Sequence, residues 1–91
     1  MVNKVAWITG AGSGIGEASA IKLSDEGFIV VLSGRTKQAL DNVASKCKGE
    51  ASVKPLDVSN SEDVKDVFES IISEHGRVDV LVASAGLNAR N

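Results

Sequence analysis

Several residue types are scarce in this chain, and each scarcity excludes a class of protein. Cysteine and proline occur once each in 91 residues, and tyrosine does not occur. Cys47 alone can form no internal disulfide, which fits a reducing compartment. The net charge is -2 and the basic residues are spread along the chain, so no basic surface for nucleic acid is expected.

Long apolar runs are also missing. No run approaches the roughly 20 residues that a membrane span needs. The N-terminus lacks the charged segment and apolar core of a secretory signal. Nor does any cluster of residues have the composition of a metal site. We therefore expect a cytoplasmic protein without a membrane or nucleic-acid partner and without a bound metal.

Short apolar clusters alternate with segments of helical periodicity, and this alternation indicates an α/β fold. Apolar positions in the clusters point to both faces, as in a parallel sheet covered by helices on both sides. The expected strands are residues 4–9, 29–32, 51–56 and 78–83. The expected helices are residues 15–26, 36–47 and a third that follows residue 59 and ends at Gly76. The fold class predicted is a Rossmann-type, doubly wound parallel sheet whose first four strands have the order 3-2-1-4.

Local signals set the expected ends of these elements. Gly27 should end the first helix as a C-terminal glycine, and Thr36 can cap the second. Ser59 and Glu62 form an S-x-x-E pattern that predicts a capping box for the third helix. Pro55 near the end of the third strand suits an edge position, because proline cannot donate to a sheet ladder.

The fourth strand raises a question about the extent of the domain. In the order 3-2-1-4 it would lie beside the first strand, with its other edge apolar and unpaired. Natural proteins pair or cover such an edge. We therefore interpret residues 1–91 as the N-terminal part of a single dinucleotide-binding domain.

A glycine-rich loop joins the first strand to the first helix, where a dinucleotide site requires it. Gly10 can form the tight turn, Gly14 can let the backbone approach a pyrophosphate, and Gly16 can let the helix pack close to the sheet. Free N–H groups of the first helical turn would face the phosphates. The alternative is a turn that only reverses the chain. No Gly-Lys-Ser/Thr follows, which excludes a P-loop.

The end of the second strand selects between cofactors. Many NAD enzymes carry an acidic residue there, whereas this chain has Ser33-Gly34-Arg35. Arg35 could pair with a 2′-phosphate, which favours NADP with NAD still possible. The alternative is a solvated arginine before a helix.

Three motifs resemble those of the short-chain dehydrogenase/reductase family. The loop has the family's T-G-x-x-x-G-x-G spacing, Asp57-Val58 follow the third strand, and residues 76–86 resemble the family's G-x-(I/V)-D-x-L-V-N-N-A-G segment. The resemblance covers essentially the whole chain. It implies these cofactor-binding residues: Gly10, Ser13, Gly14, Ile15, Gly16, Arg35, Asp57, Val58, Ala83, Ala85 and Gly86.

Simpler interpretations remain open for some of these positions. Asp57 could form an Asx turn or supply charge to a helix N-terminus. Ala85 and Gly86 could simply terminate a strand. The family's paired asparagines are Ala83 and Ser84 here, so an amide that ties neighbouring strands in the family is lost, and we expect a less rigid strand end.

The resemblance also implies a reaction, namely hydride transfer between nicotinamide and a small carbonyl or alcohol substrate by an enzyme that forms homo-oligomers when intact. The family's catalytic Ser, Tyr and Lys and its assisting Asn lie beyond residue 91, so no catalytic residue is assigned. The alternative is a non-catalytic nucleotide-binding module or a truncated product. We expect these 91 residues alone to bind the cofactor weakly.

Three single-copy residues fit structural roles. Trp7 and Cys47 are expected in the core. His75, at a helix end where a cation suits the dipole, is expected to help cap the helix.

Overall fold

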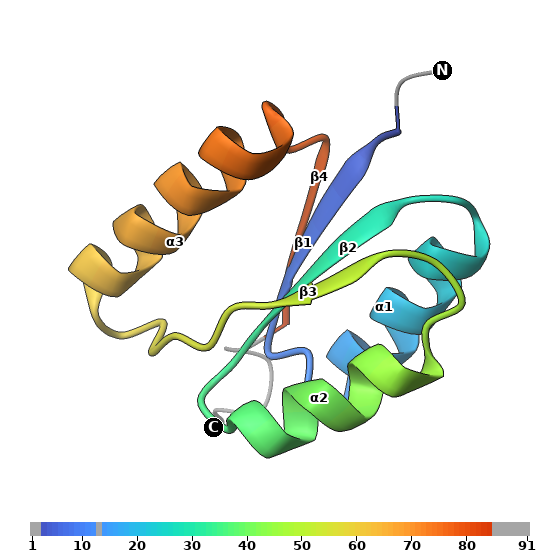
Figure 1. Ribbon diagram of the computed structural model, residues 1–91. Coiled ribbons are helices and arrows are strands. Elements are labelled where there is room, and N and C mark those ends of the chain that lie inside the picture. The colour runs from blue at the N-terminus through green and yellow to red at the C-terminus, as the bar shows by residue number, and fades with distance from the viewer. Residues whose placement is uncertain (1–2, 13, 85–91) are drawn as a thin grey trace.

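The computed structural model describes residues 3–12 and 14–84, and these form one parallel sheet with helices on both faces (Figure 1). The strand order is β3-β2-β1-β4, as predicted. The elements in chain order are β1 (Val5–Thr9), α1 (Gly14–Asp25), β2 (Ile29–Ser33), α2 (Lys37–Lys46), β3 (Ala51–Val53), α3 (Ser61–His75) and β4 (Val80–Ala83).

Alternation along the strands sends side chains into two separate cores. One core joins Ala6 and Ile8 of β1 to Leu40 and Val43 of α2. This core also receives Ala20 of α1. Helices α1 and α2 therefore cover one face of the sheet, on the side opposite α3 in Figure 1.

The second core lies beneath α3. Ile71 is fully buried there against Val5 and Trp7 of β1 and Val31 of β2. The Trp7 indole Nε1 donates a hydrogen bond to the Ser33 hydroxyl at 2.8 Å, inside the protein. Trp7 is 4% exposed, which confirms its predicted core position. Helix α3 packs on β1 and β2. It therefore leaves Leu81 of β4, on the same face, 57% exposed.

Strand limits differ slightly from those predicted. β3 ends at Val53 rather than at residue 56, yet its backbone bonds to β2 continue, with Lys54 N–H donating to Leu32 O at 2.8 Å and Leu56 N–H to Gly34 O at 2.9 Å. Pro55 falls between these two donors on an edge of the sheet, where no N–H is required.

The predicted capping box is wrong. Asn60, not Ser59, is the N-cap of α3, and its side-chain oxygen accepts from the N–H groups of Glu62 and Asp63. The Ser59 hydroxyl is instead committed to Asp57, at 2.7 Å. The S-x-x-E pattern selected the wrong residue because Asn60, one position later, is also a strong cap.

The other helix ends show a mixed outcome. Gly27 and Gly76 have φ of 97° and 80°, in the left-handed region expected at a helix C-terminus. Thr36 occupies the N-cap of α2 as predicted, but its side chain makes no capping hydrogen bond. Cys47 is the C-cap of α2 and is only partly buried against the core. Burial raises the pKa of its thiol.

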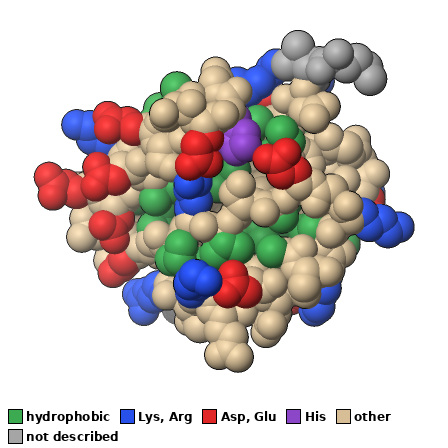
Figure 2. Space-filling model, in the orientation of Figure 1, with side chains coloured by type: hydrophobic (Ala, Val, Ile, Leu, Met, Phe, Trp, Pro, Cys, Tyr) green, Lys and Arg blue, Asp and Glu red, His purple; other side chains and the backbone are tan. Residues whose placement is uncertain are grey.

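His75 is the last residue of α3, and its environment does not match the expected cap. The capping bond comes from the Gly76 N–H to Ile72 O, at 2.8 Å. The His75 Nε2 is buried and has no hydrogen-bond partner in the described residues, with the Glu74 carboxylate 3.9 Å away. Figure 2 shows the histidine at the surface between acidic side chains.

No helix among the described residues is long and apolar enough to cross a membrane.

Candidate cofactor site

All four strands are parallel, so their carboxyl ends meet at one edge of the sheet. The glycine loop follows β1, Arg35 follows β2, Asp57 and Val58 follow β3, and Ala83 ends β4. The chain passes from β1 to β2 on one side of β1, whereas β4 lies on the other side of β1. The strand order therefore reverses direction at β1. Ligands of open α/β sheets bind outside such a reversal of strand order.

The glycine loop is held tightly at its base. Ala11 is fully buried, and its N–H donates to Ser33 O at the end of β2, at 3.0 Å. Gly10 and Gly14 have φ of 69° and 60°, which disfavour residues with a side chain. Among the described residues, neighbours in the chain and the backbone of α1 aside, no atom lies within 4 Å of the point that a Cβ on Gly14 would occupy.

Gly16 has the opposite environment. A Cβ built on it would overlap the Gly10 carbonyl oxygen and would lie 2.6 Å from the Ser84 hydroxyl. Only a glycine lets the first turn of α1 approach the end of β1 this closely. The function predicted for Gly16, close packing of helix against sheet, thus has a direct structural basis.

Ser84 ties the end of β4 to the end of β1. Its N–H and its hydroxyl both donate to Thr9 O, at 3.2 and 2.6 Å, and the hydroxyl also lies 3.3 Å from Gly10 O. We expected the loss of the family's second asparagine to loosen this strand end. The shorter serine side chain nevertheless joins the end of β4 to the backbone at the end of β1, and Ser84 is itself buried.

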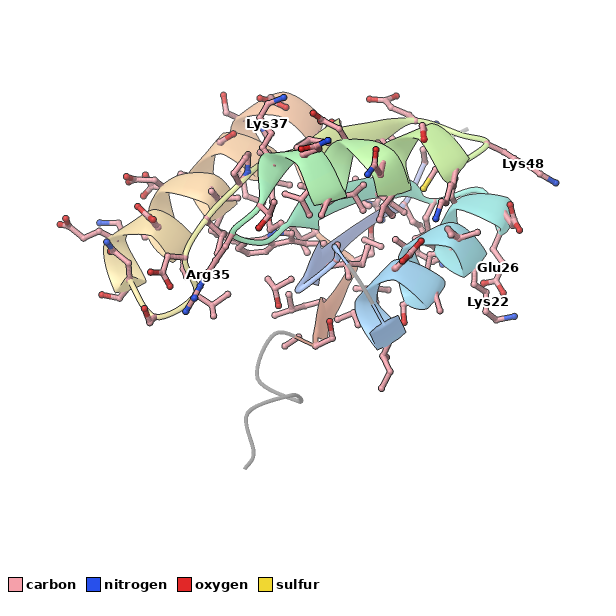
Figure 3. All side chains as sticks on the ribbon, turned by 90° about the horizontal axis from the view of Figure 1, so that it is seen from below. Lys22, Glu26, Arg35, Lys37 and Lys48 are labelled. Carbon is pink, nitrogen blue, oxygen red and sulfur yellow. The ribbon has the colours of Figure 1, made fainter. Side chains whose placement is uncertain are left out.

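Arg35 and Asp57 come together although they follow different strands. The Arg35 Nε lies 4.0 Å from Asp57 Oδ1, and the Arg35 side chain is 79% exposed. In Figure 3 Arg35 extends toward the loop after β3, whereas Lys37 lies at the start of α2. Lys37 is bound to Asp41 at 2.9 Å, so Arg35 has the looser attachment of these two cations.

Asp57 is organised by its own turn. Its carboxylate accepts the Ser59 hydroxyl at 2.7 Å and the Ser59 N–H at 2.9 Å, which is an Asx turn. These bonds, with a smaller effect from Arg35, lower the pKa of Asp57. The carboxylate is therefore an anion with a fixed orientation at neutral pH. This turn is the alternative that the sequence left open, and it leaves the second oxygen for other donors.

Two further predicted residues place apolar surface at this edge. Ile15 is 63% exposed and Val58 44% exposed, which is unusual for large apolar side chains. Ala83 is also exposed at the end of β4. Ser13, Ala85 and Gly86, also predicted for the site, lie outside the described residues. Sequence reasoning missed the contribution of Ser33, whose backbone oxygen holds the loop, because backbone acceptors leave no sequence signal.

The described residues contain no group of three or more His, Cys, Asp or Glu side chains that could hold a metal ion. The polar groups at the carboxyl edge include one arginine and one organised carboxylate. That set suits an elongated ligand with anionic and hydrogen-bonding parts.

Comparison with known proteins identifies the family. Residues 4–91 match the family described as short chain dehydrogenase. The chain belongs to the short-chain dehydrogenase family.

Curated relatives include an uncharacterized oxidoreductase of Staphylococcus aureus, 45% identical over 87 residues, which are 94% of this chain and 38% of the relative. Another, from Staphylococcus epidermidis, is 43% identical over 83 residues, which are 91% of this chain and 36% of the relative. The chain thus spans less than two fifths of the length of these oxidoreductases.

Solved structures show the same fold. A metagenomic short-chain oxidoreductase in complex with NADP superposes with a TM-score of 0.85 at 37% identity, over 89% of this chain and 38% of that one. A 3-ketoacyl-(acyl-carrier-protein) reductase from Brucella melitensis, complexed with NADH, gives a TM-score of 0.81 at 39% identity, over 88% of this chain and 33% of that one. One of these two structures therefore holds the cofactor with the 2′-phosphate and the other holds the cofactor without it.

Proposed function

We propose that this chain forms the part of a short-chain dehydrogenase domain that holds the adenosine and pyrophosphate of a nicotinamide cofactor, with NADP preferred over NAD. The observation that carries the proposal is the close approach of α1 to the end of β1 at Gly16, which keeps the start of the helix, where free N–H groups favour an anion, directly beside the glycine loop. The described residues leave space beside Gly14 that a pyrophosphate would occupy.

The residues present suit this ligand. Gly10, Gly14 and Gly16, with Ser13, would surround the pyrophosphate and ribose, and Ile15 would cover them with its exposed side chain. At the adenine end, a carboxylate can accept from the exocyclic amino group. Asp57 would make that contact with the oxygen that Ser59 does not use, beside Val58. Ala83, Ala85 and Gly86 would lie along the far ribose.

Preference for NADP rests on Arg35. A mostly exposed guanidinium, held only at 4.0 Å from Asp57, can turn its paired N–H groups to a 2′-phosphate without breaking a strong bond. An acidic residue at this position would instead favour the ribose hydroxyls of NAD.

The bound cofactor would supply the hydride, and the intact protein would move it between nicotinamide and a small carbonyl or alcohol substrate. A homo-oligomer is proposed for that intact protein.

Titration of the chain with NADPH and NADH, followed by nicotinamide fluorescence, tests the proposal. We expect weak binding, with NADPH bound more tightly. Replacing Arg35 with alanine should weaken NADPH binding roughly 10- to 100-fold, the range expected for charge-assisted hydrogen bonds, and leave NADH binding nearly unchanged.

Lys48→Ala is the matched control, because it removes the same charge at the end of the molecule opposite Arg35 (Figure 3). An equal loss for the two variants would mean that Arg35 acts only through net charge. An unchanged ratio of NADPH to NADH affinity in Arg35→Ala would refute the cofactor assignment.

A further inference from the structure

Arg35 and Asp57 are brought together by the sheet itself. Strands β2 and β3 are parallel neighbours, and their hydrogen bonding continues past β3, where the Leu56 N–H donates to Gly34 O at 2.9 Å. These two bonded residues directly precede Asp57 and Arg35 in the chain. The backbone therefore holds the two charged residues side by side, with the Arg35 Nε 4.0 Å from Asp57 Oδ1.

Of these two charged groups, the carboxylate is the fixed one. Asp57 Oδ1 accepts the hydroxyl and the N–H of Ser59, at 2.7 and 2.9 Å, and the Asp57 N–H donates to Asp63 Oδ2 on α3 at 3.4 Å. The Arg35 side chain is 79% exposed and extends toward this turn in Figure 3. When the guanidinium turns to a ligand, it must therefore move away from an anion that stays in place.

The two nicotinamide cofactors would differ in what they demand of this guanidinium. NADP and NAD are identical apart from the 2′-phosphate that NADP carries. Binding of NADP would draw Arg35 toward that phosphate and away from Asp57, whereas binding of NAD would leave the ion pair as it is. The attraction between Arg35 and Asp57 consequently opposes the binding of NADP alone.

We propose that Asp57 is a specificity-determining residue, whose negative charge competes with the 2′-phosphate for Arg35 and so reduces the preference for NADP over NAD. This role depends on the cofactor site proposed above and is additional to the adenine contact. Both side chains of the pair lie partly in water, with exposed fractions of 79% and 45%. The expected effect is therefore modest, about two- to fivefold in the ratio of the two affinities, which is the range of an exposed ion pair.

Asp57→Asn tests this role in the full chain. The asparagine amide oxygen can still accept from Ser59, so the turn is retained while the charge is lost. Titration with NADPH and with NADH at low salt, followed by nicotinamide fluorescence, should show weaker binding of both cofactors, because the adenine contact is lost for each. The ratio of NADPH to NADH affinity should nevertheless rise about two- to fivefold. This rise should disappear near 1 M salt, where the Debye length is about 3 Å.

Three further variants separate the charge from its structural setting. Glu69→Gln removes the same charge from an exposed position further along α3 and should leave the ratio unchanged. Ser59→Ala disrupts the turn but keeps the carboxylate, so the ratio should not rise. In an Arg35→Ala background, Asp57→Asn should no longer raise the ratio, because the guanidinium for which the two anions compete is absent.

An unchanged or lower ratio in Asp57→Asn would overturn the proposal. A rise of the same size in the Arg35→Ala background would also overturn it, because repulsion between the carboxylate and the phosphate would then explain the effect without Arg35. An unchanged ratio in Arg35→Ala alone would instead refute the cofactor assignment, and the role of Asp57 with it. The failure of this proposal is thereby distinguished from the failure of the proposed function.

NMR titration of the Asp57 carboxyl group tests the ion pair without any cofactor. The bonds from Ser59 chiefly lower the pKa of Asp57, and the positive charge of Arg35 lowers it further. The pKa should therefore be higher in Arg35→Ala than in the wild type. An equal pKa in the two proteins would show that Arg35 and Asp57 do not interact, and the proposed competition would then have no basis.

Discussion

Gly16 offers the sharpest test of how the loop is built. Replacing it with alanine places a methyl group against the Gly10 carbonyl and 2.6 Å from the Ser84 hydroxyl. Such overpacking costs about 1–3 kcal/mol. The methyl would also displace the Ser84 hydroxyl from Thr9 O, for about 1 kcal/mol more.

An opposing effect must be subtracted. Gly16 lies within α1, where alanine is favoured over glycine by about 1 kcal/mol. The net expectation is a loss of about 2 kcal/mol in the free energy of unfolding. For a domain of this size that corresponds to a fall in Tm of roughly 8–16 °C. Urea unfolding, followed by the fluorescence of the single tryptophan Trp7, measures this loss in the free energy of unfolding.

Gly49→Ala is the matched control. A Cβ there would lie 3.5 Å from the Ser24 hydroxyl, an ordinary contact, so we expect no loss or a gain of about 0.5 kcal/mol. In a Ser84→Ala background the penalty of Gly16→Ala should shrink by at least about 0.5 kcal/mol, because the two groups share one space. If Gly16→Ala were as stable as Gly49→Ala, close approach of α1 to β1 would not explain this glycine.

Two smaller predictions follow from the described contacts. Asn60→Ala should lower the free energy of unfolding by about 1 kcal/mol through loss of the α3 cap, whereas Ser59→Ala should cost less; equal losses in urea unfolding would reinstate Ser59 as part of the cap. The Asp79 carboxylate accepts from Arg77 and from the Val5 N–H, and these bonds, chiefly that of Arg77, lower its pKa. The stabilisation that the ionised Asp79 gives the folded state is therefore present above its unfolded pKa of about 4 and is lost as pH falls through the lower folded pKa. Below about pH 4 the urea midpoint of Asp79→Asn should thus fall less steeply with pH than that of the wild type. Equal slopes of the two midpoints against pH in this range would contradict the prediction.

Features encoded in short stretches of sequence were predictable. Strand–helix alternation indicated a parallel α/β sheet, and Gly27 and Gly76 marked helix ends, because periodicity and left-handed glycine are local properties. The strand order followed from the usual arrangement of doubly wound sheets. The cap of α3 was not predictable with certainty, since Ser59 and Asn60 are both good caps. The choice between them depends on Asp57, which takes the Ser59 hydroxyl.

Contacts between distant residues were the part that the sequence could not supply. The identities of Thr9, Gly16 and Ser84 do not indicate that the Ser84 hydroxyl joins the ends of β4 and β1 beside the first turn of α1. The same is true of the Arg35–Asp57 approach, which spans two strands. The candidate site was therefore predictable as a set of residues, but not as an arrangement.

Ser84 links the glycine loop to the end of β4. Its hydroxyl donates to Thr9 O at the base of that loop, and a Cβ on Gly16 would lie 2.6 Å from it. Loss of this hydroxyl would free the end of β4 from the end of β1 and loosen the base of the loop. Ser84→Ala should therefore weaken the binding of NADPH and of NADH by a similar factor, whereas Arg35→Ala should weaken that of NADPH alone. A changed ratio of the two affinities in Ser84→Ala would contradict this reasoning.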